Sequence, residues 1–132
     1  MKPIPEPAVL EATRARAAHW PFHTVLVANR GEIAVRILRT VQSLGLKGAV
    51  VYHAADRNAP AVRMADHAVE ITGATPVAAY LDGKQILAAA KSCGAGAIHP
   101  GYGFLSENAG FARAVAAYEV ERVRDDAGRA AL

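Results

Sequence analysis

The 132 residues of the chain have the length of one domain, which is enough to bury a modest core. Hydrophobic residues make up 52% of the chain and aromatic residues only 6%, a composition that fits a globular α/β protein and excludes a disordered one outside the chain ends. The formal net charge of +3 comes from scattered arginines without interleaved aromatic residues, so no nucleic-acid surface is predicted.

The apolar runs, the cysteine content and the N-terminal residues indicate the compartment. No apolar run approaches the roughly 18 residues that a membrane span requires, so none is predicted. The single cysteine, Cys93, excludes an internal disulfide and favours a reducing, cytoplasmic compartment; we interpret it as a packed residue. Residues 1–23 lack the apolar core of a secretory signal and predict a flexible N-terminal extension.

A βαβ unit is predicted to follow this extension. The apolar run Val25–Val27 is typical of a strand and stops at Asn29–Gly31. Apolar residues between Ile33 and Leu44 then recur close to a helical period, and Gly45 is placed to end that helix. The run Ala49–Tyr52 is apolar at every position, which predicts a second strand buried on both faces, as in a parallel sheet.

The rest of the chain repeats this alternation of strands and helices. The predicted elements are, in order, a polar connection at His53–Pro60, a short helix at Ala61–Ala65, a strand at Ala68–Thr72, an irregular segment at Pro76–Tyr80, a helix around Ile86–Lys91 that ends at Gly94, and a last strand at Ala95–Ile98. Four strands that alternate with helices imply right-handed crossovers. The sequence therefore predicts an α/β fold with a Rossmann-like, doubly wound, mainly parallel sheet.

The last strand leads into a glycine-rich segment, residues 97–108. Pro100 and two glycines forbid regular structure there, and Ser106–Asn108 supply side-chain acceptors for the start of a helix. In an open parallel sheet this junction lies at the carboxyl end of a strand, where ligands usually bind. His99 and Tyr102 are therefore either recognition residues or structural residues. In the structural interpretation His99 only satisfies backbone groups and Tyr102 only packs the loop down. The residues alone leave both interpretations open.

Several familiar chemical motifs are excluded. The turn at residues 28–33 has one glycine where the dinucleotide fingerprint needs three, and no phosphate-binding P-loop sequence is present. Asn29 and Arg30 can hold an anion at a helix N-terminus, but Glu32 can equally complement the helix dipole, and we favour the structural interpretation. The five histidines show no paired metal-ligand spacing, so no metal site and no catalytic residue are predicted.

Several separate motifs share one order and register. They are Val27–Ala34 followed by Arg36–Arg39, Ala55–Asp56, Ala65–Asp66, Tyr80–Leu81 and His99–Asn108. Together they resemble the N-terminal domain of biotin carboxylase, the ATP-dependent component of biotin-dependent acyl-CoA carboxylases. The resemblance implies a pre-ATP-grasp domain at residues 24–116, between the N-terminal extension and a divergent C-terminal tail at residues 117–132.

The resemblance also implies a function, cofactors and partners. The complete family enzyme uses ATP and magnesium to activate bicarbonate as carboxyphosphate, and then carboxylates biotin carried on a partner protein. The implied partners are the remainder of biotin carboxylase, a biotinyl carrier protein or domain, a carboxyltransferase subunit and a second copy in a homodimer. Tyr102 and Gly103 are implied contacts of biotin, or Tyr102 only anchors the loop. Arg39 and, less directly, Arg36 are implied intersubunit contacts, or both belong to a solvated helix face.

The end of the chain departs from the family pattern after Ala116. Phosphoryl transfer needs cationic residues around the phosphates and a lid, whereas Lys47, Lys84 and Lys91 are expected on helices or at their ends. We therefore expect no autonomous ATP-dependent carboxylation and no tightly bound cofactor. A non-catalytic interaction module that docks on a carboxylase or its carrier protein, and a small nucleotide binder, are the alternatives. The helix at Ile33–Leu44 is expected to expose apolar surface when the domain stands alone.

Overall fold

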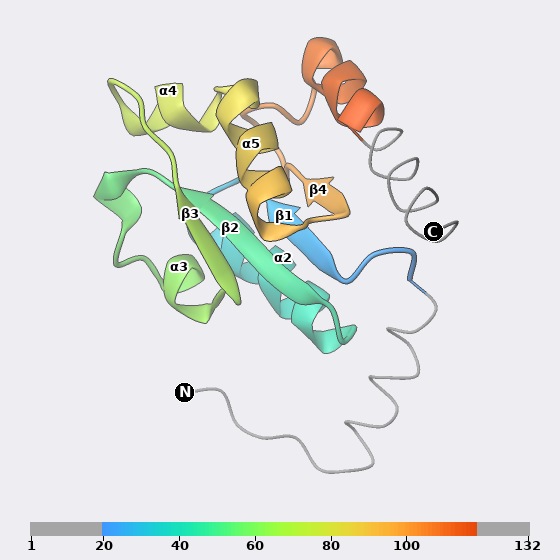
Figure 1. The fold of residues 1–132 in the computed structure, drawn as a ribbon. Coiled ribbons are helices and arrows are strands. Elements are labelled where there is room, and N and C mark those ends of the chain that lie inside the picture. Colours follow the sequence, from blue (N-terminus) through green and yellow to red (C-terminus); the bar gives the residue numbers. More distant parts are fainter. Residues whose placement is uncertain (1–19, 119–132) are drawn as a thin grey trace.

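A parallel four-stranded sheet lies between two layers of helices in the computed structural model, which describes residues 20–118 (Figure 1). The strand order is β3-β2-β1-β4, and all three strand pairs are parallel. The strands are β1 (Thr24–Val27), β2 (Lys47–Tyr52), β3 (His67–Glu70) and β4 (Ala97–His99). This topology confirms the predicted Rossmann-like α/β fold, because the chain moves outward to β3 and then crosses back to pair β4 with β1.

Helices connect these strands, as the periodicity predicts. They are α2 (Gly31–Ser43), the short 3₁₀ helix η1 (Ala54–Asp56), α3 (Pro60–Met64), α4 (Pro76–Tyr80) and α5 (Gly83–Cys93), and residues 109–118 are also helical. The predicted glycine stops are confirmed, since Gly45 and Gly94 have positive φ angles just beyond α2 and α5. Asp82 begins α5 by accepting a hydrogen bond from the Gln85 amide, and the hydrogen bonds from Gln85 lower the pKa of Asp82.

The segment at Pro76–Tyr80 differs from its prediction, because it forms α4 instead of an irregular connection. Thr75 caps this helix by accepting a hydrogen bond from the Ala78 amide over 3.1 Å, and Pro76 occupies the first turn, where a proline is tolerated. Five residues are too few to show a helical period. The third strand starts one residue earlier than predicted, at His67, and ends two residues earlier, at Glu70. Its residues are mostly exposed because β3 is an edge of the sheet.

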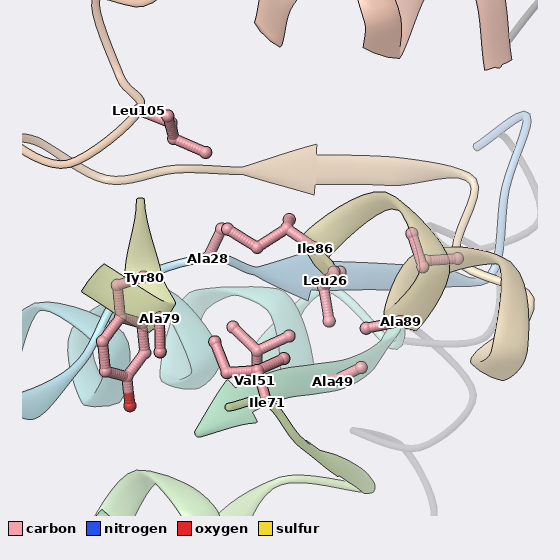
Figure 2. Close-up of a cluster of buried hydrophobic side chains, with 12 residues drawn as sticks. Leu26, Ala28, Ala49, Val51, Ile71, Ala79, Tyr80, Ile86, Ala89 and Leu105 are labelled. Atoms are coloured by element: carbon pink, nitrogen blue, oxygen red, sulfur yellow. The ribbon is translucent and has the colours of Figure 1, made fainter. Parts of the chain in front are cut away.

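The core consists of two layers, one on each face of the sheet. On one face Leu26 and Val51 pack against Ile86 of α5, and Figure 2 shows these side chains in one cluster with Tyr80 of α4. On the opposite face α2 and α3 cover β1 and β2 through Val27, Leu38, Val50 and Ala61. Alternate residues of β1 and β2 therefore face opposite layers, which confirms burial on both sides of the central strands.

The ends of the described region pack onto this core. Phe22 lies against the cluster of Val25, Val41 and Leu46, and the Tyr118 hydroxyl donates a hydrogen bond to the Ala95 carbonyl over 3.1 Å. The remainder of the predicted N-terminal extension, residues 1–19, and of the predicted tail, residues 119–132, lies outside the described residues.

Cys93 is a half-buried residue at the end of α5. Its Sγ donates a hydrogen bond to the Ala90 carbonyl over 3.6 Å, and burial raises the pKa of the thiol. The thiol therefore keeps its proton near neutral pH, which agrees with the interpretation of Cys93 as a packed residue.

Close packing of α2 on β2 generates a first prediction, at Gly48. A Cβ atom on Gly48 would lie 2.4 Å from Cδ2 of Leu38, whose side chain is buried. We expect Gly48→Ala to lower the free energy of unfolding by about 1–3 kcal/mol through overpacking, and Leu38→Ala by about 2–5 kcal/mol through the cavity it leaves. Urea unfolding followed by circular dichroism measures both values.

The double variant distinguishes this packing conflict from a general weakness of the strand. Because the methyl group of Gly48→Ala enters the space that Leu38→Ala vacates, the double variant is expected to lose less stability than the two single losses combined. Additive losses would contradict the packing explanation.

Candidate functional site

Three connections meet at one edge of the sheet, where the strands β1, β2 and β4 end. The parallel pairing places Val27 beside both Val50 and His99, so the segments that follow these strands start side by side. The Ala28 amide donates to the His99 carbonyl over 2.9 Å, which carries the pairing one residue beyond β1. The expectation that the connections after the strands share one edge is therefore confirmed, and this edge is the candidate site.

Asn29 joins the first connection to the glycine loop, which we define as residues 100–106. The Asn29 side chain is 1% exposed, and its Nδ2 donates to the carbonyl oxygens of Pro100 and Tyr102, each over 2.8 Å. Its Oδ1 accepts a hydrogen bond from the Arg30 amide over 2.8 Å. Since donors and acceptor are all engaged within the protein, Asn29 has a structural role, as favoured from the sequence, and does not hold an anion.

Gly101 permits this close approach. Its φ angle is +67°, and a Cβ atom there would lie 2.7 Å from Nδ2 of Asn29 and 2.9 Å from Cγ2 of Ile33. A side chain at this position would both strain the backbone and displace the Asn29 amide. The glycine is therefore required by two separate constraints.

His99 and Tyr102, the two residues with open interpretations, have different roles. Nδ1 of His99 accepts a hydrogen bond from the Gly101 amide over 3.0 Å, so His99 satisfies a backbone group of the loop. The Tyr102 side chain is 74% exposed and does not pack the loop down, which makes the loop-anchor interpretation of this side chain wrong. Only the Tyr102 carbonyl is fixed, through Asn29, and the phenol projects into solvent.

A network of charged and aromatic groups lies beneath the same edge. Arg30 Nη2 contacts Asp56 Oδ1 at 2.6 Å, and the Tyr80 hydroxyl donates to Asp56 Oδ2 over 2.8 Å. The Arg30 guanidinium also lies 5.5 Å from the centre of the Tyr80 ring. Burial, followed by the hydrogen bond to Asp56, raises the pKa of Tyr80, so its hydroxyl keeps the proton that it donates.

The sequence motifs contain Arg30, Asp56 and Tyr80 but do not predict that the three side chains meet. Because Pro76–Tyr80 is predicted as irregular, the hydrophobic periodicity predicts neither the burial of Tyr80 nor its contact with Asp56. The pair Thr75–Pro76 is the signal that finds α4, since a threonine followed by proline is typical of a helix start.

The predicted interface residues Arg36 and Arg39 lie on α2. Nε of Arg36 is 3.7 Å from Glu32 Oε1, and both side chains are largely exposed, so this pair contributes little to stability. Arg39 is exposed and forms no ion pair within residues 20–118. Within residues 20–118 neither arginine forms an ion pair or hydrogen bond with the Tyr102 side chain.

An apolar groove of about 560 Å³ separates α2 from the edge strand β4. One wall is formed by Ile37 and Val41 of α2 and by its C-cap Leu44, as expected of this helix, and Ile98 of β4 and Trp20 also line the groove. The strand β4 is the outermost strand of the sheet on this side. The groove and the strand edge together form an uncovered apolar surface within the described part of the chain.

Metal ligation, membrane insertion and the placement of lysines can each be checked for the described residues. None of them form a group of three or more His, Cys, Asp or Glu residues that would suit a metal ion, and none of their helices has the length and apolar character to cross a bilayer. Lys84 and Lys91 lie on α5, whereas Lys47 begins β2 and does not end a helix, which corrects its expected position. The sheet edge offers an exposed phenol and bare peptide groups.

The two glycines of the loop provide a matched test of the Asn29 contact. Gly103 also has a positive φ, +74°, but a Cβ there would meet no atom within 4 Å. Gly103→Ala is therefore expected to lower the free energy of unfolding by about 1 kcal/mol through backbone strain alone. Gly101→Ala is expected to lose about 1–3 kcal/mol more, because it also displaces Asn29. Equal losses in urea unfolding would contradict the role assigned to the Asn29 contact.

Comparisons with known proteins point to one family. A curated relative, the biotin-dependent acyl-coenzyme A carboxylase alpha3 subunit of Mycobacterium leprae, is 56% identical over 91 residues, which are 69% of this chain and 15% of that protein. The dimeric biotin carboxylase domain of Hydrogenobacter thermophilus 2-oxoglutarate carboxylase, solved with Mg-ADP, ADP and bicarbonate, is 44% identical with a TM-score of 0.72. The match covers 76% of this chain and 22% of that domain.

A second solved structure and the family profile agree with these matches. Campylobacter jejuni biotin carboxylase, in complex with a β,γ-ATP ligand, is 44% identical with a TM-score of 0.72 over 74% of this chain and 22% of its own. This chain thus spans less than a quarter of each of these proteins. The profile described as "Biotin carboxylase, N-terminal domain" matches residues 21–123. Because the profile spans most of the chain and the fold agrees with the solved carboxylases, the chain belongs to the biotin carboxylase N-terminal domain family.

Proposed function

We propose that this chain serves as the N-terminal domain of a biotin carboxylase of the acyl-CoA carboxylase type and supplies one wall of the biotin pocket. The observation that carries the proposal is the exposed Tyr102 phenol on a loop whose carbonyls are tied to Asn29. A ligand-facing side chain on a loop that is fixed by buried hydrogen bonds is typical of a binding site on a parallel sheet edge. In this proposal residues 24–116 form the functional domain.

Tyr102 and Gly103 are the proposed contacts of carrier-bound biotin. The phenol supplies an aromatic surface and a hydroxyl, which suits a ligand with an apolar ring system and a polar ureido group. The surroundings of Gly103 are open, because a Cβ atom there would have no neighbour within 4 Å, so a ligand can approach the peptide group closely. The remaining walls of the pocket belong to other parts of the complete enzyme.

ATP and magnesium, which the complete enzymes of this family require, do not fit the described residues. These residues contain no acidic cluster for a divalent ion, and Arg30, the arginine of the connection after β1, is paired with Asp56. Nucleotide binding and phosphoryl transfer are therefore proposed to belong to the remainder of the carboxylase. This reasoning supports a domain that is inactive by itself and also disfavours a small nucleotide binder.

The proposed partners follow from the exposed arginines of α2 and from the apolar groove, which Arg36 also lines. The exposed Arg39, and less directly Arg36, are proposed to form ion pairs with a second subunit, as a counterpart to the dimer of the relative from Hydrogenobacter thermophilus. The carboxylase remainder is proposed to cover the apolar groove beside α2, with a biotinyl carrier and a carboxyltransferase as further partners. A reducing, cytoplasmic compartment is proposed from the single, unpaired cysteine.

The apolar groove also favours an alternative, a non-catalytic module that docks on a carboxylase or its carrier protein. The two functions are distinguished by a chimaera in which residues 24–116 replace the matching segment of the Mycobacterium leprae subunit. A functional domain yields ATP-dependent carboxylation of free biotin in the chimaera and none in the isolated chain. An inactive, folded chimaera together with saturable binding of the isolated chain to the intact subunit would favour the docking module.

The biotin contact predicts the kinetics of Tyr102→Ala in this chimaera. We expect the KM for biotin to rise about tenfold, which corresponds to a loss of about 1.4 kcal/mol of binding free energy. The KM for ATP should not change, because the phenol is remote from the nucleotide in this proposal. The control is Val77→Ala on α4, which removes a side chain of comparable exposure, 50%, outside the loop. An unchanged KM for biotin would contradict the assignment of Tyr102.

The dimer contact predicts the effect of reversing a charge on α2. In the chimaera, Arg39→Glu is expected to raise the dimer dissociation constant at least tenfold, since an interfacial cation would become an uncompensated anion. Sedimentation velocity over a concentration series measures this constant. Arg63→Glu, an equal charge reversal on α3, should leave it unchanged. If both variants dimerise like the parent, Arg39 does not belong to the interface.

A further inference from the structure

Phe104 has an unusual backbone conformation within the glycine loop. Its φ angle is +44°, and among residues 20–118 it is the one non-glycine residue with a positive φ. For a bulky L-residue the left-handed region is unfavourable, because Cβ crowds the following carbonyl oxygen. Such a conformation persists only where the surrounding structure holds it, so the contacts of Phe104 must offset this cost.

The Phe104 side chain packs against Tyr80. The two ring centres are 5.4 Å apart with an angle of 41° between the planes, and Phe104 is half-buried against the cluster that contains Tyr80. Tyr80 is 1% exposed. The next residue of the loop, Leu105, is buried in the same cluster, so the chain on this side of the loop is drawn into the core.

The ring of Tyr80 is itself held at its opposite end. Its hydroxyl donates to Asp56 over 2.8 Å and accepts from the His53 amide over 3.3 Å, while Asp56 is paired with Arg30. The guanidinium of Arg30 also lies over the Tyr80 ring. Hydrogen bonds, an ion pair and a cation–π contact therefore fix the ring against which Phe104 packs.

We propose that Tyr80 is a positioning residue for the glycine loop: its ring, fixed by Asp56 and Arg30, holds Phe104 in the left-handed conformation and thereby fixes where Tyr102 and Gly103 stand. The loop then has two anchors. Asn29 fixes the carbonyls of Pro100 and Tyr102, and Tyr80 fixes Phe104, which leaves the two proposed ligand contacts between them.

Both anchors belong to one connected structure. Arg30 follows Asn29 directly, donates its amide to the Asn29 side chain and pairs through its guanidinium with Asp56. A shift of either anchor therefore moves the other through Arg30. That these two anchors matter for biotin binding rests on the proposed function. That they position the loop does not depend on it.

The test compares variants of the full 132-residue chain by hydrogen exchange measured with NMR. The reporters are the amides of Gly101, Ser106 and Asn108, which donate hydrogen bonds within the loop segment. Tyr80→Leu removes the ring, and Tyr80→Phe keeps the ring while removing its hydroxyl. Leu38→Ala is the matched control, because it destabilises the opposite core layer without touching the loop.

We expect Tyr80→Leu to accelerate exchange of the reporter amides at least tenfold. Tyr80→Phe should accelerate it by a smaller factor, about threefold, because the ring keeps its contacts with Phe104 and Arg30 but loses the hydrogen bond to Asp56 that helps to fix it. Leu38→Ala should leave these amides unchanged, because loop amides exchange through local opening. The Phe104 ring resonances should shift in Tyr80→Leu and remain in place in Leu38→Ala. If Tyr80→Leu does not fold, Phe104→Leu removes the same ring contact from the loop side.

The outcomes separate the inference from the proposed function. Parent-like reporter exchange in the folded ring-removing variants, or equal acceleration in Leu38→Ala, overturns the positioning role of Tyr80. Strong acceleration confined to the ring-removing variants supports it. If this acceleration is seen while Tyr102→Ala leaves the KM for biotin unchanged, the positioning role stands and the proposed biotin contact fails.

Discussion

The structure depends most on the side-chain amide of Asn29, which ties the end of the first strand to the glycine loop. An asparagine that is almost fully buried needs partners for its donors and its acceptor, because an unpaired buried polar group is costly. Two backbone carbonyls of the loop and the Arg30 amide supply them. The loop carries no regular hydrogen-bonding pattern of its own, so these bonds substitute for the secondary structure that proline and glycine prevent.

A second set of contacts completes the support of the loop from the core. Tyr80, Asp56 and Arg30 belong to three different segments, and they meet beneath the sheet edge because parallel strands end on the same side. Phe104 packs on this group in a backbone conformation that it would not adopt alone. The exposed phenol of Tyr102 is thus carried on a rigid base, and rigid placement of a recognition group reduces the entropy lost when a ligand binds.

This small domain carries two surfaces of different character, the polar sheet edge and the apolar groove beside α2. The sheet edge is built from satisfied polar groups with one exposed aromatic residue, whereas the groove is apolar and borders the outermost strand β4. Apolar surface of this kind is typical of a face that packs against further protein. A domain that spans less than a quarter of the length of its relatives is expected to show such a face. Tyr102 belongs to the sheet edge and does not line the groove.

Local sequence determined the central strands, α2, α5 and their glycine stops, because hydrophobic period and cap residues act over a few positions. It also determined that the connections share an edge, since parallel strands leave no other arrangement, and the shared motifs identified the family. The helix at Pro76–Tyr80 is too short to show a period, and only its start at Thr75–Pro76 is marked in the sequence. Tertiary structure alone decided the partners of Asn29, which lie 71 and 73 residues further along the chain. It likewise decided the conformation of Phe104 and the burial of Tyr80, because these follow from contacts between distant segments that no local pattern records.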